Sequence, residues 1–307
     1  MFAHLVDIYG AVELDQVHRL HHSWERQASL RLGTGDPAVL AEYERRGRLH
    51  GGTLDQLEVE IITAWQQARQ CGDTVALMGN STDTVTRLNQ LAQDRRIAAR
   101  ELQLTGPRLR TGEQWLLVGD EVVTRRNDRT LRTDQGLMVK NRDHWTITDI
   151  HRDRSVTVTG RTGSIRLPAD YVTENLELGY AQTSHATQGR TLDVALLLID
   201  SPTDSPTDSR GIYTPMTRGR EANHAYVVTE DNQTSIDILT QALARDWIDQ
   251  PAVARTAQLG RHHTKQLTPD DPGDQTEVDE LVRRAQRLVA ERRTRTREVE
   301  RSLGRGL

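Results

Sequence analysis

The sequence GYAQTSHATQGRTLDVALLLIDSPTDSPTDSRGIYTPMTRGREANHAYVVT spans residues 179–229 and contains two short apolar runs, at residues 194–199 and 225–228. Their length and β-branched content predict two buried strands. A dense polar cluster precedes each run, at residues 183–191 and 213–220. Polar and basic residues at the ends of parallel strands are typical of a phosphate or nucleic-acid site in an open α/β sheet. This stretch therefore predicts a fold class and the position of a site.

Composition places few limits on function. The chain has 307 residues, and this length predicts two domains or one domain with an insertion. Hydrophobic residues make up 36% and charged residues 27%, so a core is expected under a heavily charged surface. Aromatic residues make up only 4%, so any surface on which bases stack would be small. The net charge of −4 argues neither for nor against nucleic acid, because basic residues can cluster locally.

Cysteine and histidine positions exclude several kinds of site. Cys71 is the only cysteine, which excludes an internal disulfide framework and a cysteine-based zinc site and favours the reducing cytoplasm. His18, His21 and His22 cluster without a carboxylate or cysteine at ligand spacing, so we expect a solvated helix face and no metal site. No apolar run approaches ~20 residues and no signal-peptide pattern opens the sequence, so no membrane contact is expected.

The N-terminal part of the sequence predicts helices. Apolar residues at intervals of three and four, starting at Leu14, predict an amphipathic helix that ends near Gly33 or Gly35. Arg19 is expected on this helix, away from its apolar stripe. Two further helices, interpreted as scaffold, are expected within residues 36–70.

A strand, turn and helix are expected next. Residues 75–78 predict a short buried strand. The turn that follows contains Asn80 and Ser81, has the chemistry of a helix N-cap, and leads into an amphipathic helix. This order of elements is one unit of a parallel α/β sheet, and its polar turn is a candidate anion site.

The sequence has no Walker A loop. That loop needs GxxxxGK followed by Ser or Thr, and no such stretch occurs. The only lysines are Lys140 and Lys265, and neither follows a glycine-rich loop. Any nucleotide phosphates near this chain are therefore not expected to be held by a Walker A loop of its own.

Residues 107–175 change to short alternating runs separated by turn residues. Five or six strands in about sixty residues predict a small β-barrel inserted in the α/β domain. Arg125 and Arg126, with two nearby arginines, make one end of this unit basic. Two interpretations remain open at this point, a solvated hairpin and a groove for a phosphate backbone.

After residue 230 the strand pattern ends. Residues 235–248 predict an amphipathic helix, and residues 260–275 are polar with Pro and Asp turns, as in a linker. Residues 277–303 predict a charged helix rich in arginine. This helix is compatible with a solvated helix, a partner-binding helix or a basic nucleic-acid arm.

Two motifs in the opening stretch resemble those of a known family. YAQTSHATQGRT at residues 180–191 resembles motif V of superfamily 1 helicases, above all the branch of RecD and the conjugative relaxases TraA, TraI and TrwC. YTPMTRGR at residues 213–220 resembles motif VI of the same group, except that Pro215-Met216 stands where the family has Ala-Leu. The two motifs occur in the family's order and about thirty residues apart, and the resemblance covers roughly residues 1–230.

The resemblance implies an α/β fold with three parts. Residues 1–106 and 172–232 are expected to form a discontinuous RecA-like parallel sheet, helicase domain 2A, with N-terminal helices. Residues 107–171 are expected to form the inserted SH3-like β-barrel 2B, and residues 233–307 a helical charged tail. The family's first RecA-like domain, with its Walker A and B motifs, would precede Met1.

The resemblance also implies roles for particular residues. Arg218 and Arg19 correspond to arginines that stabilise charge on the γ-phosphate of ATP, Arg19 at the family's motif IV. The remaining positions are expected nucleotide contacts or single-strand DNA contacts. The nucleotide contacts are Gln188, Gly189 and Arg220, and the DNA contacts are Thr183, His185, Asn80, Ser81, Arg125 and Arg126.

The function implied is that of a cytoplasmic, ATP-dependent DNA helicase of the conjugation and plasmid-mobilisation type. ATP and Mg²⁺ are the implied cofactors, although this chain by itself is not expected to bind Mg²⁺ or to hydrolyse ATP. The implied partners are single-stranded DNA and a separately encoded N-terminal helicase or relaxase polypeptide. Two alternatives stay open: a non-catalytic DNA- or partner-binding module, and an inactive remnant of a split relaxase gene.

Overall fold

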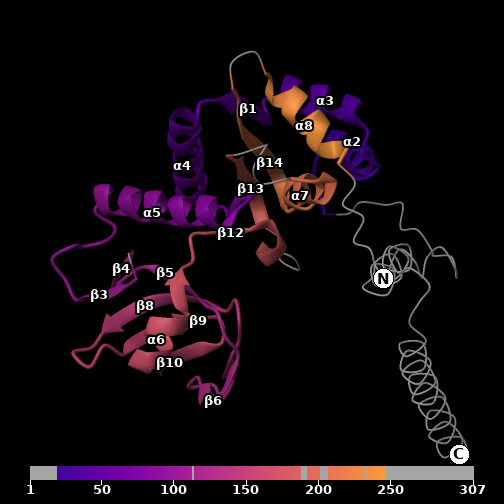
Figure 1. Ribbon diagram of the computed structural model, residues 1–307. Coiled ribbons are helices and arrows are strands. Elements are labelled where there is room, and N and C mark those ends of the chain that lie inside the picture. The colour runs from indigo at the N-terminus through magenta and orange to yellow at the C-terminus, as the bar shows by residue number, and fades with distance from the viewer. Residues whose placement is uncertain (1–18, 113, 188–191, 201–206, 231–232, 246–307) are drawn as a thin grey trace, which may run out of the picture. The chain divides into compact units, whose positions relative to one another are not determined.

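A five-stranded parallel sheet organises the fold (Figure 1). The computed structural model describes residues 19–112, 114–187, 192–200, 207–230 and 233–245. The strand order is β1-β14-β13-β2-β12, and every neighbouring pair is parallel. The strands are β1 (Leu49–Gly52), β2 (Val75–Gly79), β12 (Ala181–Thr183), β13 (Leu192–Ile199) and β14 (Gly219–Val228). The predicted α/β class with a parallel sheet is therefore confirmed.

Helices cover both faces of this sheet (Figure 1). The helices are α2 (Ser23–Gly33), α3 (Leu40–Arg45), α4 (Leu54–Gln70), α5 (Thr82–Ala98), α7 (Ser209–Tyr213) and α8 (Ser235–Leu243), with 3-10 turns η1 (Pro37–Val39), η2 (Ser184–Thr187) and η3 (Pro215–Thr217). Strand β13 divides its side chains between two cores. Leu196 and Leu198 pack with α4 and α5, whereas Leu197 and Ile199 pack with α2, α3 and α8. Burial on both faces explains why the sequence of this strand is continuously apolar.

A second, antiparallel unit follows α5. Its five-stranded sheet has the order β10-β9-β8-β5-β11, and β3–β4 and β6–β7 form two separate pairs. The SH3-like barrel expected for this unit stays a prediction. The described strands form three separate sheets, and these are not joined into one closed barrel. The elements are β3 (Arg108–Thr111), β4 (Gln114–Leu117), β5 (Glu121–Thr124), β6 (Asp128–Arg132), β7 (Met138–Val139), β8 (His144–Ile150), β9 (Val156–Gly160), β10 (Gly163–Leu167), α6 (Ala169–Asn175) and β11 (Leu176–Leu178).

Gly179 and Tyr180 join the two sheets. Strand β11 pairs with β5 of the antiparallel sheet, and β12 pairs with β2 of the parallel sheet, so only these two residues separate the two pairings. A Cβ on Gly179 would lie 2.8 Å from Val123 Cγ1 and 2.9 Å from the main chain of Val122. The close approach of β5 therefore requires glycine at this position.

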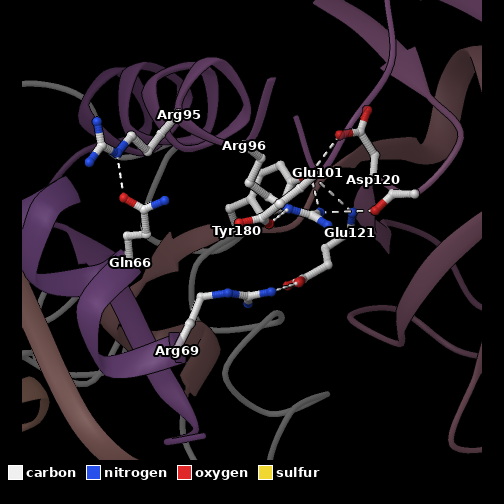
Figure 2. A network of polar contacts seen from close by, with 9 residues as sticks. Gln66, Arg69, Arg95, Arg96, Glu101, Asp120, Glu121 and Tyr180 are labelled. Atoms are coloured by element: carbon white, nitrogen blue, oxygen red, sulfur yellow. Dashed lines mark hydrogen bonds and ion pairs between the residues drawn. The ribbon is translucent and has the colours of Figure 1, made fainter. Parts of the chain in front are cut away.

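A buried polar network holds the chain at this joint (Figure 2). The hydroxyl of Tyr180 donates to Asp120 Oδ1 at 2.5 Å, and Arg96 Nη1 donates to the same hydroxyl at 2.9 Å. Asp120 Oδ2 accepts from Gln93 Nε2 at 2.7 Å and from the Leu117 N–H at 2.6 Å. Burial raises the pKa of Asp120, and the three donors oppose the rise. The network thus connects α5 to both sheets through satisfied polar groups.

The first predicted helix is wrong at its N-terminal end. Among the described residues it begins at Ser23, so Arg19 lies in a bend before α2 and not on the helix. The segment is instead tied to strand β14: the His21 N–H donates to the Arg220 carbonyl at 2.9 Å, and His21 Nδ1 lies 2.6 Å from Glu221 Oε1. Tertiary contacts outweigh the helical periodicity here. The residues before 19 lie outside the described part of the chain.

The edge strand β1 was not predicted from the sequence. Its segment, Leu49–Gly52, contains two glycines and reads as a break between helices. It is ordered by parallel pairing with β14, in which His50 lies opposite Tyr226. The two rings stack with centroids 4.3 Å apart. Cross-strand packing of this kind stabilises a strand whose two glycines give it a low intrinsic strand propensity.

A directed hydrogen-bond chain crosses β1 and β14. Arg48 Nη1 lies 2.7 Å from His224 Nε2, and His224 Nδ1 lies 3.0 Å from His50 Nε2. Because a guanidinium only donates, Nε2 of His224 accepts, and the neutral ring carries its proton on Nδ1. Burial, together with the nearby Arg48 and His50, lowers the pKa of His224 to about 3.

The hydrogen bonds of His224 predict that the stability of the protein depends on pH. The folded pKa of His224 lies below its unfolded value of 6.5, so its contribution is complete above pH 6.5 and is lost as pH falls toward 3. The variant His224→Gln keeps an acceptor for Arg48 but has no ring to protonate. Its free energy of unfolding is therefore expected to fall less steeply as pH decreases, by up to about 1 kcal/mol per pH unit. Urea unfolding at pH 7, 6 and 5 measures the difference. Equal pH slopes for both proteins would contradict the assignment.

No helix in the described ranges has the length and apolarity required to cross a membrane.

Candidate functional site

Two arginines converge at the amino end of the parallel strands. Arg218 follows η3 directly before β14, and its Nε donates to the Thr214 carbonyl at 2.9 Å. Arg19 Nη1 donates to the Thr217 carbonyl at 3.1 Å. Residues that are far apart in the sequence therefore bring two guanidinium groups to one turn. We call this pair, Arg19 and Arg218, the arginine edge.

The arginine edge carries uncompensated positive charge. Arg218 is half-buried, and burial together with the charge of Arg19 lowers its pKa. Across the described part of the chain, neither guanidinium lies within 4.0 Å of a carboxylate. Two like charges held together in this way attract an anion, and guanidinium is suited to phosphate because it donates two parallel hydrogen bonds.

Arg220 lies at the same edge but is already paired. Its Nε donates to Asp193 Oδ1 at 2.6 Å. Asp193 Oδ2 also accepts from the hydroxyl and N–H of Thr74, at 2.6 and 2.8 Å. These hydrogen bonds from Thr74, and then the one from Arg220, lower the pKa of Asp193 to about 2. Arg220 thus differs from Arg218, which forms no ion pair with any carboxylate in the described ranges.

A buried amide fixes the backbone beside Arg218. Asn223 Oδ1 accepts from the Gly219 N–H at 2.7 Å, and Asn223 Nδ2 donates to Glu25 Oε1 on α2 at 2.9 Å. A Cβ on Gly219 would lie 2.2 Å from the Ala222 carbonyl, so the tight turn requires glycine. The sequence analysis missed Asn223 and Glu25, because a buried polar pair across two elements leaves no local pattern.

A groove of about 530 Å³ lies at the opposite, carboxyl edge of the sheet. Its walls come from the start of α5, the end of β12 and the antiparallel unit. Thr183 and Arg125, both predicted DNA contacts, line this groove together with Arg142, which the sequence analysis did not single out. The remaining lining residues are Thr82, Val85, Thr86, Asn89, Thr111, Gln114, Val123, Glu177, Leu178, Ala181, Gln182 and Ala186.

The groove contains exposed guanidinium groups that are weakly held. Arg125 Nε lies 3.4 Å from Glu177 Oε2, and both side chains are about half exposed, at 48% and 56%. Arg142 is exposed and has a φ of 67°, a backbone conformation that L-residues adopt only rarely. Exposed ion pairs contribute little to stability, so Arg125 is available to a phosphate.

Arg126 is directed to a different place from Arg125. Its guanidinium lies over the ring of Tyr171, 5.6 Å from the centroid, and 3.8 Å from the carboxylates of both Asp128 and Glu174. It is not among the residues that line the groove. Both residues lie in the turn between β5 and β6, where this change of direction takes place.

The other predicted DNA contacts form hydrogen bonds within the fold or lie outside the described part of the chain. Ser81 is the N-cap of α5 and accepts from the Thr84 N–H at 3.0 Å. Asn80 Oδ1 accepts from the Thr84 hydroxyl at 3.2 Å, and neither Asn80 nor Ser81 lines the groove. His185 lies in η2, but its side chain is outside the described part of the chain, as are the whole of Gln188 and Gly189.

The groove and the arginine edge are joined by one stretch of chain. Strand β12 ends at Thr183 at the carboxyl edge, and β13 begins at Leu192 at the amino edge. Residues 184–191 therefore connect the two edges, which lie about 23 Å apart along the eight residues of β13. Within the described ranges, no group of three His, Cys, Asp or Glu side chains is arranged to hold a metal ion.

Comparison with known proteins finds conjugal transfer proteins. A family model described as an AAA domain matches residues 1–54. The conjugal transfer protein TraA of Agrobacterium fabrum (strain C58 / ATCC 33970) is 30% identical over 235 residues, which cover 73% of this chain and 20% of that protein. TraA of Rhizobium radiobacter is 28% identical over 238 residues, which cover 74% and 20%. The chain thus spans about a fifth of the length of the curated relatives it matches.

Solved helicase structures also show a distant likeness. One concerns DNA unwinding at forked dsDNA by two coordinating Pif1 helicases, with 14% identity, a TM-score of 0.41, and coverage of 81% of this chain and 54% of that one. Another is Bacteroides Pif1 bound to ssDNA, with 16% identity, a TM-score of 0.34, and coverage of 62% and 46%.

Proposed function

We infer that this chain, a relative of the TraA-type superfamily 1 helicases, supplies the second RecA-like half of an ATP-driven DNA motor. In this proposal the groove holds single-stranded DNA and the arginine edge completes an ATP site. The phosphate-holding half of that site belongs to another RecA-like domain, carried on a longer form of this chain or on a separate polypeptide. The absence of a Walker A loop from the sequence makes such a second half necessary.

The position of the two basic sites at opposite edges of one sheet carries the proposal. A motor must couple a nucleotide event to movement along DNA. Here the chain lines the groove as far as Ala186, and β13 begins at Leu192, beside the turn that holds Arg218. The Leu192 N–H lies 3.5 Å from the Arg218 carbonyl. In this proposal a displacement of one edge reaches the other along β13, which spans both edges and begins beside Arg218. The expected nucleotide contacts Gln188 and Gly189 lie outside the described residues.

At the arginine edge the residues fit the charge of a nucleotide triphosphate. Arg218 and Arg19 are held by main-chain carbonyls and not by carboxylates, so both can face an anion. When ATP is bound, such groups neutralise charge that develops on the transferred phosphoryl oxygens. Mg²⁺ would be held by the other half of the site. Arg220, paired with Asp193, positions the start of β14 in this proposal.

At the groove the chemistry fits a phosphate backbone. Arg125 and Arg142 supply charge, and Thr183 supplies a hydroxyl and an amide group at the end of β12. Such groups bond phosphate oxygens without reading base identity. We therefore expect binding of single-stranded DNA that depends on salt and little on sequence.

Removing the groove arginines is expected to weaken DNA binding. The double variant Arg125→Ala/Arg142→Ala should bind a 15-nucleotide single strand on the order of 10-fold less tightly at low salt. Its slope of log K against log salt should be shallower by about 1.4, because two phosphate contacts are lost. Fluorescence anisotropy at several salt concentrations measures both quantities.

Arg126→Ala provides a matched control, since it removes the same charge from the neighbouring residue outside the groove. It should leave the salt slope of the wild-type protein unchanged. If Arg126→Ala and the double variant reduce binding equally per charge removed, the groove is not the DNA site. If the wild-type protein shows no salt-dependent binding, the DNA part of the proposed function is wrong.

A further inference from the structure

The β3–β4 hairpin presents two different faces. In its antiparallel register Arg110 lies opposite Trp115, and Thr111 lies opposite Gln114. Side chains alternate between faces along a strand, so one face carries Thr111 and Gln114, which line the groove. The other carries Arg108, Arg110 and Trp115, which are all exposed, and also Leu117, which is buried opposite Arg108. We call this second face the hairpin platform.

Trp115 is unusual among the described tryptophans. It is 43% exposed, whereas Trp65 and Trp145 are each 2% exposed and Trp24 is half-buried. The Arg108 guanidinium lies 5.1 Å from the centroid of the Trp115 ring. In a chain with only 4% aromatic residues, an indole left in water beside a cation is not explained by core packing.

The two arginines of the hairpin platform form hydrogen bonds to main-chain carbonyls. Arg108 Nη1 donates to the Leu104 carbonyl at 3.1 Å, and Arg110 Nε donates to the Gly112 carbonyl at 3.2 Å. Among residues that the structure describes, no carboxylate forms an ion pair with either of them. The face therefore combines an exposed ring with two positive charges that no described carboxylate neutralises. This is the combination that binds a nucleic-acid strand through its bases and its phosphates.

We propose that the hairpin platform is a stacking site for an unpaired base of single-stranded nucleic acid. Trp115 stacks on the base, and Arg108 and Arg110 neutralise the flanking phosphates. The strand reaches this face from the groove, around the edge of the hairpin whose other face lines it. The inference rests on the proposed function only in that the groove delivers the strand.

The main chain of strand β4 is anchored independently of the Trp115 side chain. Gln93 Nε2 on α5 donates to the Trp115 carbonyl at 2.8 Å, so the main chain at this position is anchored without the indole. Leu116 and Leu117, the next two residues, are fully buried at 0% exposure. Replacement of the Trp115 side chain is therefore expected to leave the hairpin in place, which makes the proposal testable by substitution.

The test compares two strands of equal charge on the full chain. One is a 15-nucleotide oligothymidylate, and the other has the same backbone with abasic sites throughout. The wild-type protein should bind the base-containing strand about 10-fold more tightly and show quenched tryptophan fluorescence with that strand only. Trp115→Phe should keep most of this preference, and Trp115→Leu should remove it while binding the abasic strand as the wild type does.

The outcomes separate this inference from the proposed function. Equal binding of both strands by the wild-type protein, or an unchanged preference in Trp115→Leu, would overturn the hairpin platform while salt-dependent binding through Arg125 and Arg142 still stands. Loss of preference in Trp115→Leu, with binding insensitive to Arg125→Ala/Arg142→Ala, would support the platform and contradict the groove. Trp24→Phe is the matched control, because it changes a half-buried tryptophan elsewhere and should leave the preference intact.

Discussion

Replacing Arg218 by alanine is expected to lower DNA-dependent ATP hydrolysis about 10³-fold, the lower end of what an arginine finger supplies to phosphoryl transfer. The measurement needs both halves of the ATP site. A hybrid in which this chain replaces its matching segment in the Agrobacterium fabrum TraA protein tests whether the two halves combine. Arg218 has no carboxylate partner among the described residues and is held only by the Thr214 carbonyl, so its loss removes charge from the site without releasing a buried acid.

Two further variants of the hybrid sharpen this result. Arg218→Lys keeps the charge but not the fork of donors, and we expect it to restore only part of the rate. Arg220→Ala removes an equal charge two residues away that is already neutralised by Asp193, and we expect less than a 10-fold change. A hybrid that hydrolyses ATP and loses equal activity with either alanine variant would contradict the role of Arg218.

The largest expected loss of stability comes from Asp120→Ala. Asp120 is fully buried and accepts from Tyr180, Gln93 and the Leu117 N–H. Alanine at this position leaves the Tyr180 hydroxyl and the Leu117 N–H without an acceptor and leaves Gln93 Nε2 with the Trp115 carbonyl alone. We expect a cost of about 3–5 kcal/mol in the free energy of unfolding. The loss is expected to reach DNA binding too, because Tyr180 directly precedes Ala181, which lines the groove. Urea unfolding followed by circular dichroism measures the first effect, and anisotropy the second.

Glu121→Ala is the matched control for this loss. Glu121 is the next residue, and its Oε1 lies 2.6 Å from Arg69 Nη2 in a pair that remains about one third exposed (Figure 2). Such a pair contributes about 1 kcal/mol or less. If both variants lost stability equally, burial of the Asp120 network would not be what fixes the joint between the two sheets.

The sequence was most informative where burial acts on both sides of a strand. Residues 194–199 are apolar throughout because β13 is covered on both faces. Such a continuous run can be recognised without knowing which elements cover it. The prediction of a helix before Ser23 was wrong for the opposite reason. Its periodicity was helical, but main-chain and side-chain contacts from His21 to β14 hold that segment in another conformation. Local pattern predicts an element only where no distant partner competes for it.

The same distinction separates the site residues that were predicted from those that were missed. Arg218, Thr183 and Arg125 lie in or near stretches dense in polar residues, and the structure places them at the arginine edge and in the groove. Arg142 and Asn223 also have polar neighbours in the sequence, so local composition does not distinguish them from an ordinary turn or exposed strand. They acquire a role only when folding brings them beside residues 17 or more positions away, such as Arg125 or Glu25.

The contact between Arg96 and Tyr180 has a consequence for the antiparallel unit. Arg96 lies near the end of α5, where the chain departs for the antiparallel unit, and Tyr180 is where it returns. An insert whose two ends touch can be lengthened or exchanged without separating the elements that flank it, provided that Asp120 keeps its contacts with Tyr180 and Gln93.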